Sequence, residues 1–124
     1  MKKIIFWFLV FLVWVPDGRA QAPYFEGKTI RIVVGYPAGS AHDQWGRLIA
    51  PYLTKFIPGN PNAIVQNMAG AGSIVAANYI YGIVKPDGLS LGIVNAALYF
   101  DQLLGRKEVQ FDWPKFAWIG SSTP

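Results

Sequence analysis

The chain has 124 residues with 11 lysines and arginines, seven aspartates and glutamates, one histidine and no cysteine, and its formal net charge is +4. The lack of cysteine excludes disulfides, thiolate metal sites and cysteine nucleophiles. A chain of this length can bury one modest core.

The first twenty residues have the pattern of an export signal. Two lysines after Met1 are followed by an apolar run from Ile4 to Val15 and then by a Pro-Asp-Gly break. A helix of this length spans about 18 Å, too short for the roughly 30 Å hydrocarbon core of a membrane, so the run is typical of a cleaved signal peptide. We expect cleavage after Ala20, because the alternative site after Ala22 would place Pro23 beside the scissile bond.

The charge of the chain owes much to this segment. Removal of residues 1–20 lowers the formal net charge to +2, and the remaining lysines and arginines are scattered along the chain. A nucleic-acid partner would require a clustered basic surface. We therefore expect an exported, periplasmic chain of residues 21–124 that binds no nucleic acid.

The rest of the sequence alternates strand and helix patterns. Strands are expected at residues 29–34, 63–66, 89–94 and 116–120, and helices follow Ser40, an N-cap residue, and Ser73, with a short one at 96–104. This alternation with short loops predicts an α/β fold with a mostly parallel sheet and flanking helices.

The first helix has a regular apolar pattern. Its apolar side chains recur at helical spacing and form one face of an amphipathic helix, namely Trp45, Leu48, Ile49, Tyr52, Leu53 and Phe56. Pro51 lies inside this pattern and is expected to kink or divide the helix near residues 47–50, because proline removes a backbone hydrogen bond.

Three loops follow the carboxyl ends of the predicted strands, where parallel sheets bind their ligands. They are the first loop (36–43), the second loop (67–73) and the third loop (95–99). The first two are rich in glycine and each opens a helix, whose free N–H groups suit an anion such as a carboxylate without help from arginine or lysine. The same glycines are equally compatible with simple tight turns.

Other chemistries have less support in the sequence. Gly70-Ala71-Gly72 partly matches a dinucleotide-binding turn, but Val75 occupies the third glycine position and Asn95, not an acidic residue, follows the next strand. His42 is the only histidine, and its neighbours Ser40 and Asp43 lie too close in sequence to form a catalytic triad with it. A metal site would need more than one histidine and a nearby aspartate. We expect no catalytic residue, metal or cofactor. There are two alternatives to a carboxylate-binding domain: a small exported nucleotide-binding oxidoreductase-like domain, and a non-catalytic adhesion or scaffold module.

Four ordered stretches carry a resemblance to a known family. They are IRIVVGYPAGSAHDQWGRLIAPYL, IPGNPNAIVQNMAGAGSIVAANYIY, VKPDGLSLGIVNAALYFDQLLG and FDWPKFAWIGS, which together cover nearly all of residues 24–122. In their order and spacing they resemble the receptors of tripartite tricarboxylate transporters, the Bug family of periplasmic solute-binding proteins.

The resemblance implies a two-lobed receptor that presents a small di- or tricarboxylate to membrane permease subunits. It also implies that the ligand is held largely by backbone groups of the loops, at Ala38, Gly39, Ser40, Asp43, Gly70, Ala71, Gly72 and Ser73, with Asn95 and Ala96 from the third loop. The family usually has a second glycine where Ser40 stands and often a glycine where Ser73 stands. Because family members are much longer, residues 21–124 are expected to form the opening part of the first lobe, with the second lobe missing.

Overall fold

The computed structural model describes residues 22–121, so the predicted signal peptide of residues 1–20 lies outside the described residues. The regular elements are, in chain order, β1 (Thr29–Val34), α2 (Ala41–Phe56), β2 (Asn62–Asn67), η1 (Ala71–Ser73), α3 (Ile74–Gly82), β3 (Ser90–Ile93), α4 (Leu98–Leu103) and η2 (Trp113–Lys115). The predicted alternation of strands and helices is confirmed, with shifts of one or a few residues at several boundaries.

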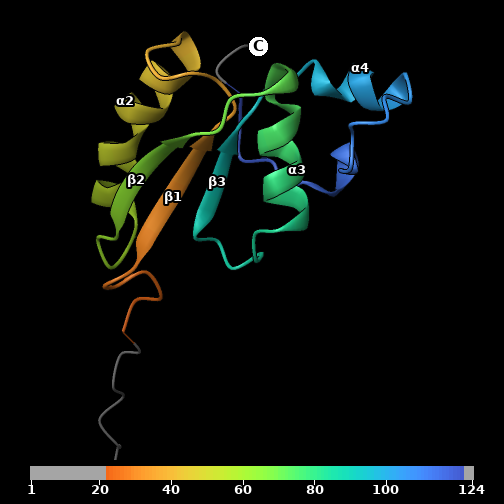
Figure 1. The fold of residues 1–124 in the computed structure, drawn as a ribbon. Helices are drawn as coiled ribbons and strands as arrows, with labels where there is room; N and C mark the ends of the chain where they lie inside the picture. Colours follow the sequence, from red (N-terminus) through yellow and green to blue (C-terminus); the bar gives the residue numbers. More distant parts are fainter. Residues whose placement is uncertain (1–21, 122–124) are drawn as a thin grey trace, which may run out of the picture.

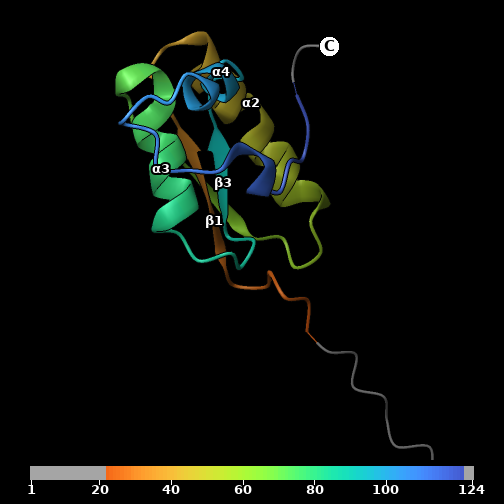
Figure 2. The same ribbon diagram turned by 90° about the vertical axis from the view of Figure 1, so that its right-hand side faces the viewer.

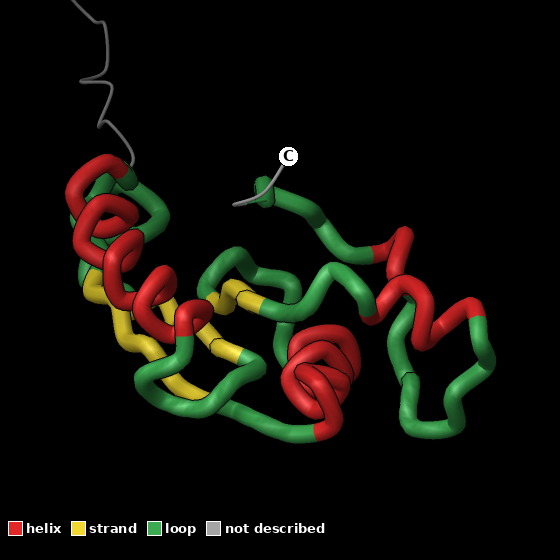
Figure 3. The backbone as a smooth tube through the Cα atoms, turned by 90° about the horizontal axis from the view of Figure 1, so that it is seen from above, coloured by secondary structure: helices red, strands yellow, loops and turns green. Residues whose placement is uncertain are grey.

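The three strands form one parallel sheet in the order β2-β1-β3 (Figure 1). In the register of the sheet, Ile32 of β1 pairs with Val65 of β2 and Leu91 of β3. Helix α2 covers one face and α3 the other, as Figures 2 and 3 show. The central strand is therefore buried on both faces, which explains its run of β-branched residues.

Helix α2 begins where the sequence predicts and continues through its proline. The Ser40 hydroxyl accepts a hydrogen bond from the Asp43 N–H at 3.3 Å, which caps the first turn. Pro51 lies inside the helix without dividing it. A Cβ atom on Gly46 would lie 3.2 Å from side-chain atoms of both Val34 and Ile93, so this glycine lets the helix pack closely on the sheet.

The apolar face of α2 is only partly buried. Leu53 packs on the cluster around Ile32, whereas four larger side chains are at least half exposed: Trp45 at 50%, Leu48 at 53%, Tyr52 at 58% and Phe56 at 72%. The residues of α2 that are buried against the sheet are instead Asp43, Gly46 and Ala50, which lie on a different side of the helix from these four. Helical periodicity thus identified the helix but not the side of it that faces the sheet, which carries small residues rather than most of the large apolar ones.

A second apolar cluster lies on the α3 side of the sheet. Ile74, Ala77, Leu98 and Phe111 are its buried members. The strand predicted at residues 116–120 is wrong, because that segment is irregular and joins no ladder. Its aromatic rings pack instead against Trp113, with ring centroids 6.0 Å away for Phe116 and 4.3 Å for Trp118. Among residues 22–121, no helix combines the length and apolar character needed to cross a membrane.

Candidate ligand-binding site

The three loops leave the same edge of the sheet, at the carboxyl ends of its parallel strands (Figure 1). Backbone hydrogen bonds hold the strand ends together there. Gly35 N–H donates to the Ile93 carbonyl at 2.9 Å, and Met68 N–H donates to the Val34 carbonyl at 2.7 Å. The residues predicted for the site therefore all lie at one edge of the sheet, in the loops and in the first turns of the helices that follow them.

The first and second loops approach each other closely at Gly35. A Cβ atom at this position would lie only 2.6 Å from Ser73 Cβ and 3.1 Å from Ser73 Cα. Real Cβ atoms do not tolerate such distances, so only glycine allows the start of α3 to pack on the end of β1. Gly35 thus sets the separation of the two loops.

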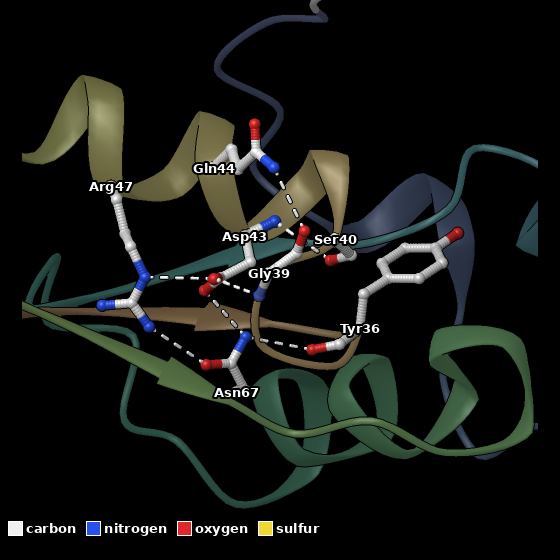
Figure 4. A network of polar contacts seen from close by, with 7 residues as sticks. All are labelled: Tyr36, Gly39, Ser40, Asp43, Gln44, Arg47 and Asn67. Atoms are coloured by element: carbon white, nitrogen blue, oxygen red, sulfur yellow. Dashed lines mark hydrogen bonds and ion pairs between the residues drawn. The ribbon is translucent and has the colours of Figure 1, made fainter.

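A polar network centred on Asp43 fixes the first loop (Figure 4). The Asp43 side chain is only 3% exposed. Its Oδ2 atom accepts from the Gly39 N–H at 2.8 Å and from Arg47 Nε at 3.0 Å, and its Oδ1 atom accepts from Asn67 Nδ2 at 2.9 Å. Asp43 therefore points into the protein, and both of its oxygens have partners.

Asn67 connects the two loops through the same network. Its Nδ2 atom donates to the Tyr36 carbonyl at 3.0 Å as well as to Asp43, and its Oδ1 atom accepts from Arg47 Nη2 at 3.3 Å. This single amide joins the end of β2, the end of β1 and the first two turns of α2. The geometry makes Asn67 a cross-link between the loops.

The network favours the ionised form of Asp43. The hydrogen bond from Arg47, followed by those from Gly39 and Asn67, lowers the pKa of the Asp43 carboxyl to about 2, although burial acts in the opposite direction. A buried carboxylate is tolerated here because several donors and one guanidinium surround it.

The first loop uses several of its own backbone donors internally. Gly39 N–H donates to Asp43, and Ser40 N–H donates to the Pro37 carbonyl at 3.2 Å. By contrast, the N–H groups of Ala41 and His42, in the first turn of α2, donate to no atom of residues 22–121. Such groups at a helix start are available to an anion. The open donors thus lie one or two residues beyond the Gly39-Ser40 pair that the sequence emphasised.

The second loop has an unusual backbone and more open donors. Ala71, Gly72 and Ser73 have positive φ angles of 45°, 62° and 81° in succession. Within the described part of the chain, no acceptor is bonded to the N–H groups of residues 69–72, whereas Ser73 N–H donates to the Gly70 carbonyl at 3.0 Å. Consecutive backbone N–H groups in turn conformations form concave anion-binding surfaces.

The side chain of Ser73 is buried and not exposed at the loop surface. The residue is 0% exposed and lies against Gly35, and its hydroxyl has no hydrogen-bond partner within residues 22–121. A positive φ at a residue other than glycine is uncommon and costs free energy. Ser73 therefore adds strain and an unsatisfied hydroxyl to the second loop.

The third loop contributes less. Asn95 Oδ1 accepts from the Ala97 N–H at 2.9 Å, so this side chain organises the start of α4. The N–H groups of Asn95 and Ala96 have no acceptor among the described residues.

Within the first loop, the ring of His42 stacks on that of Tyr36, with centroids 3.9 Å apart and planes 10° from parallel.

The open donors at this edge of the sheet are of a kind that suits an anion, whereas a metal centre would need clustered side-chain ligands. No group of three or more His, Asp or Glu side chains in residues 22–121 is placed to hold a metal ion. An open hollow of about 540 Å³ lies at the opposite end of the sheet, between the last turns of α2 and the start of β2, where Lys55 and Asn62 line it. It contains none of the loop donors, so we do not assign the site to it.

Comparison with known proteins shows two similar relatives, and no protein-family model matches the chain. A UPF0065 protein from the 5′ region of gbd in Cupriavidus necator is 37% identical over 81 residues, which are 65% of this chain and 24% of the relative. A UPF0065 protein of Bordetella bronchiseptica is 34% identical over 97 residues, which are 77% of this chain and 28% of the relative. The chain belongs to the UPF0065 family. This is the Bug family that the sequence resembles, and the present chain spans about a quarter of the length of these relatives.

The sequence of this UPF0065 chain identified the loops but not the residues that organise them. The sequence places Asn67 only at the start of the second loop and assigns no role in the site to Arg47. Two signals were present in the sequence: the four-residue spacing of Asp43 and Arg47 on a helix, and an asparagine that ends a strand just before a glycine loop. Their convergence is a tertiary contact, which spacing alone does not specify.

Proposed function

We propose that this chain is part of a periplasmic solute-binding receptor that captures a small organic carboxylate, of the di- or tricarboxylate class, for a tripartite tricarboxylate-type transporter. Membership of the UPF0065 family supports the receptor role. The ligand class and the permease partner are suggested by the resemblance and by the donor chemistry of the loops. The signal-like pattern of residues 1–20 supports the periplasmic location.

The set of unengaged backbone donors is the observation that carries the proposal. The N–H groups of residues 41–42, in the first turn of α2, and of residues 69–72, in the second loop, lie at one edge of the sheet and have no acceptor among the described residues. These donors belong to residues that are exposed or half-buried, so a ligand can reach them, and carboxylate oxygens satisfy such groups well. The dipole of α2 also favours negative charge at its start, beside Ala41 and His42.

Ligand-detected NMR tests the proposal directly, because saturation transfer detects even weak binding. We would compare propane-1,2,3-tricarboxylate with the matched neutral propane-1,2,3-tricarboxamide, and include NAD as a nucleotide probe. The proposal predicts saturation transfer to the tricarboxylate or to a shorter dicarboxylate such as succinate, and much less to the amide. Binding of NAD alone would favour the nucleotide-binding alternative, and no binding of any carboxylate would overturn the proposal.

A further inference from the structure

A buried carboxylate, that of Asp43, lies next to the candidate anion site. Asp43 receives the Gly39 N–H and stands in the first turn of α2, beside the open donors of Ala41 and His42. Its lowered pKa keeps it ionised at neutral pH. An uncompensated negative charge at this place would repel an anionic ligand.

We propose that Arg47 is a positioning residue that neutralises the buried Asp43 and thereby allows an anion to bind at the first loop. This inference rests on the proposed carboxylate-binding function. Arg47 acts through Asp43 and Asn67, and no contact with the ligand itself is required of it.

The contacts of Arg47 fit this role. Its Nε atom lies 3.0 Å from Asp43 Oδ2, and its Nη2 atom donates to Asn67 Oδ1 at 3.3 Å (Figure 4). In the described part of the chain, no other basic side chain forms an ion pair with Asp43. The Arg47 side chain is 54% exposed, whereas that of Asp43 is 3% exposed, so the pair presents its positive member toward solvent.

The consequence is a selective effect on anions. Loss of the guanidinium would leave Asp43 buried with one unit of uncompensated charge close to the loop donors. At the effective dielectric constant near a protein surface, two like charges several ångströms apart weaken binding by about tenfold or more. A neutral ligand of the same shape would be affected much less.

The test measures affinity for propane-1,2,3-tricarboxylate in Arg47→Met, Asp43→Asn and the double variant. Lys55→Met serves as the control, because it removes the same charge eight residues further along α2, about 12 Å away. We expect about tenfold weaker binding in Arg47→Met, little change in Lys55→Met, and recovery of most of the affinity in the double variant. Thermal unfolding of every variant, in parallel, reports on folding.

The recovery distinguishes charge compensation from a merely structural role. If Arg47 only braced the loops, the double variant would bind no better than Arg47→Met, and that result would overturn the inference. Unchanged tricarboxylate affinity in Arg47→Met would also overturn it while leaving the proposed function intact. If the unmodified chain bound no carboxylate, both the proposed function and this inference would fail.

Discussion

The first and second loops occupy equivalent places in the fold but differ in how their backbones are satisfied. The first loop is held by side-chain hydrogen bonds, because the Asp43 carboxylate accepts from the Gly39 N–H and from the side chains of Arg47 and Asn67. Beyond Asn67 the second loop has no such network and instead takes left-handed conformations at three successive residues, with the N–H groups of residues 69–72 unpaired among the described residues. Both loops thus offer open donors, the first from a backbone held by side chains and the second from a strained backbone.

The largest effect is expected where the two loops meet. Gly35→Ala places a Cβ atom 2.6 Å from Ser73 Cβ, so the loops must separate, and we expect the free energy of unfolding to fall by about 3 kcal/mol. Chemical denaturation measures this loss. Gly82→Ala is the control, because nothing lies within 4 Å of its added Cβ. Equal stability of the two variants would show that the loops do not depend on this close approach.

Loss of the cross-link should be the next largest effect. Asn67→Ala removes the bonds to Tyr36, Asp43 and Arg47, and we expect a loss of about 2 kcal/mol in the free energy of unfolding. Hydrogen exchange should become faster in the first loop as well as in the second. Asn62→Ala, on the exposed beginning of the same strand, should change the stability by less than about 0.5 kcal/mol. Unaltered exchange in the first loop of Asn67→Ala would contradict the cross-link.

Acid should weaken the first loop through Asp43. Its pKa is lowered to about 2 from an ordinary value of 3.8, so the unfolded chain binds the proton more readily. The stabilising contribution is therefore fully present above about pH 4 and is lost as the pH falls toward 2. We expect the Tm of the unmodified chain to fall more steeply between pH 4 and pH 2 than that of Asp43→Asn, by several degrees. Parallel curves would show that the Asp43 carboxylate is not stabilised in the fold. The pKa of Asp112 is also lowered, by Lys115, but Asp112 is present in both proteins and affects their curves equally.

The smallest effect compares one substitution in both loops. Ser73→Gly removes a strained positive φ and a buried hydroxyl without a described partner, so we expect about 1 kcal/mol of added stability. Ser40→Gly removes the side-chain cap of α2 at a residue whose backbone is ordinarily extended. The free energy of unfolding should therefore fall by a few tenths of a kcal/mol. Opposite signs in chemical denaturation would confirm the contrast between the loops, and a destabilised Ser73→Gly would refute it.

Local patterns predicted the elements well. The β-branched run of residues 29–34 is β1 with the expected bounds, and Ser40 is the expected cap, because both features depend on neighbours in sequence. The carboxyl-edge rule for parallel sheets also placed all three loops together. These predictions needed no knowledge of distant contacts.

Predictions that depended on distant contacts were less successful. Trp45 and Phe56 are exposed because α2 turns Gly46 and Ala50 toward the sheet, and Phe116 and Trp118 pack on Trp113 instead of joining a strand. The roles of Arg47 and Asn67 likewise arise only when α2 and β2 meet. Sequence spacing therefore located the candidate site but did not identify which donors in it are open.

The most direct test of the account is a titration of the isotopically labelled chain with propane-1,2,3-tricarboxylate, followed by the backbone amide signals in heteronuclear NMR. We predict the largest shifts at the N–H groups of residues 41–42 and 69–72, with smaller ones at residues 95–96, and little change when the matched tricarboxamide is added. Shifts confined to the hollow near Lys55, or no shifts at any concentration, would contradict the assignment of these loops as an anion-binding site.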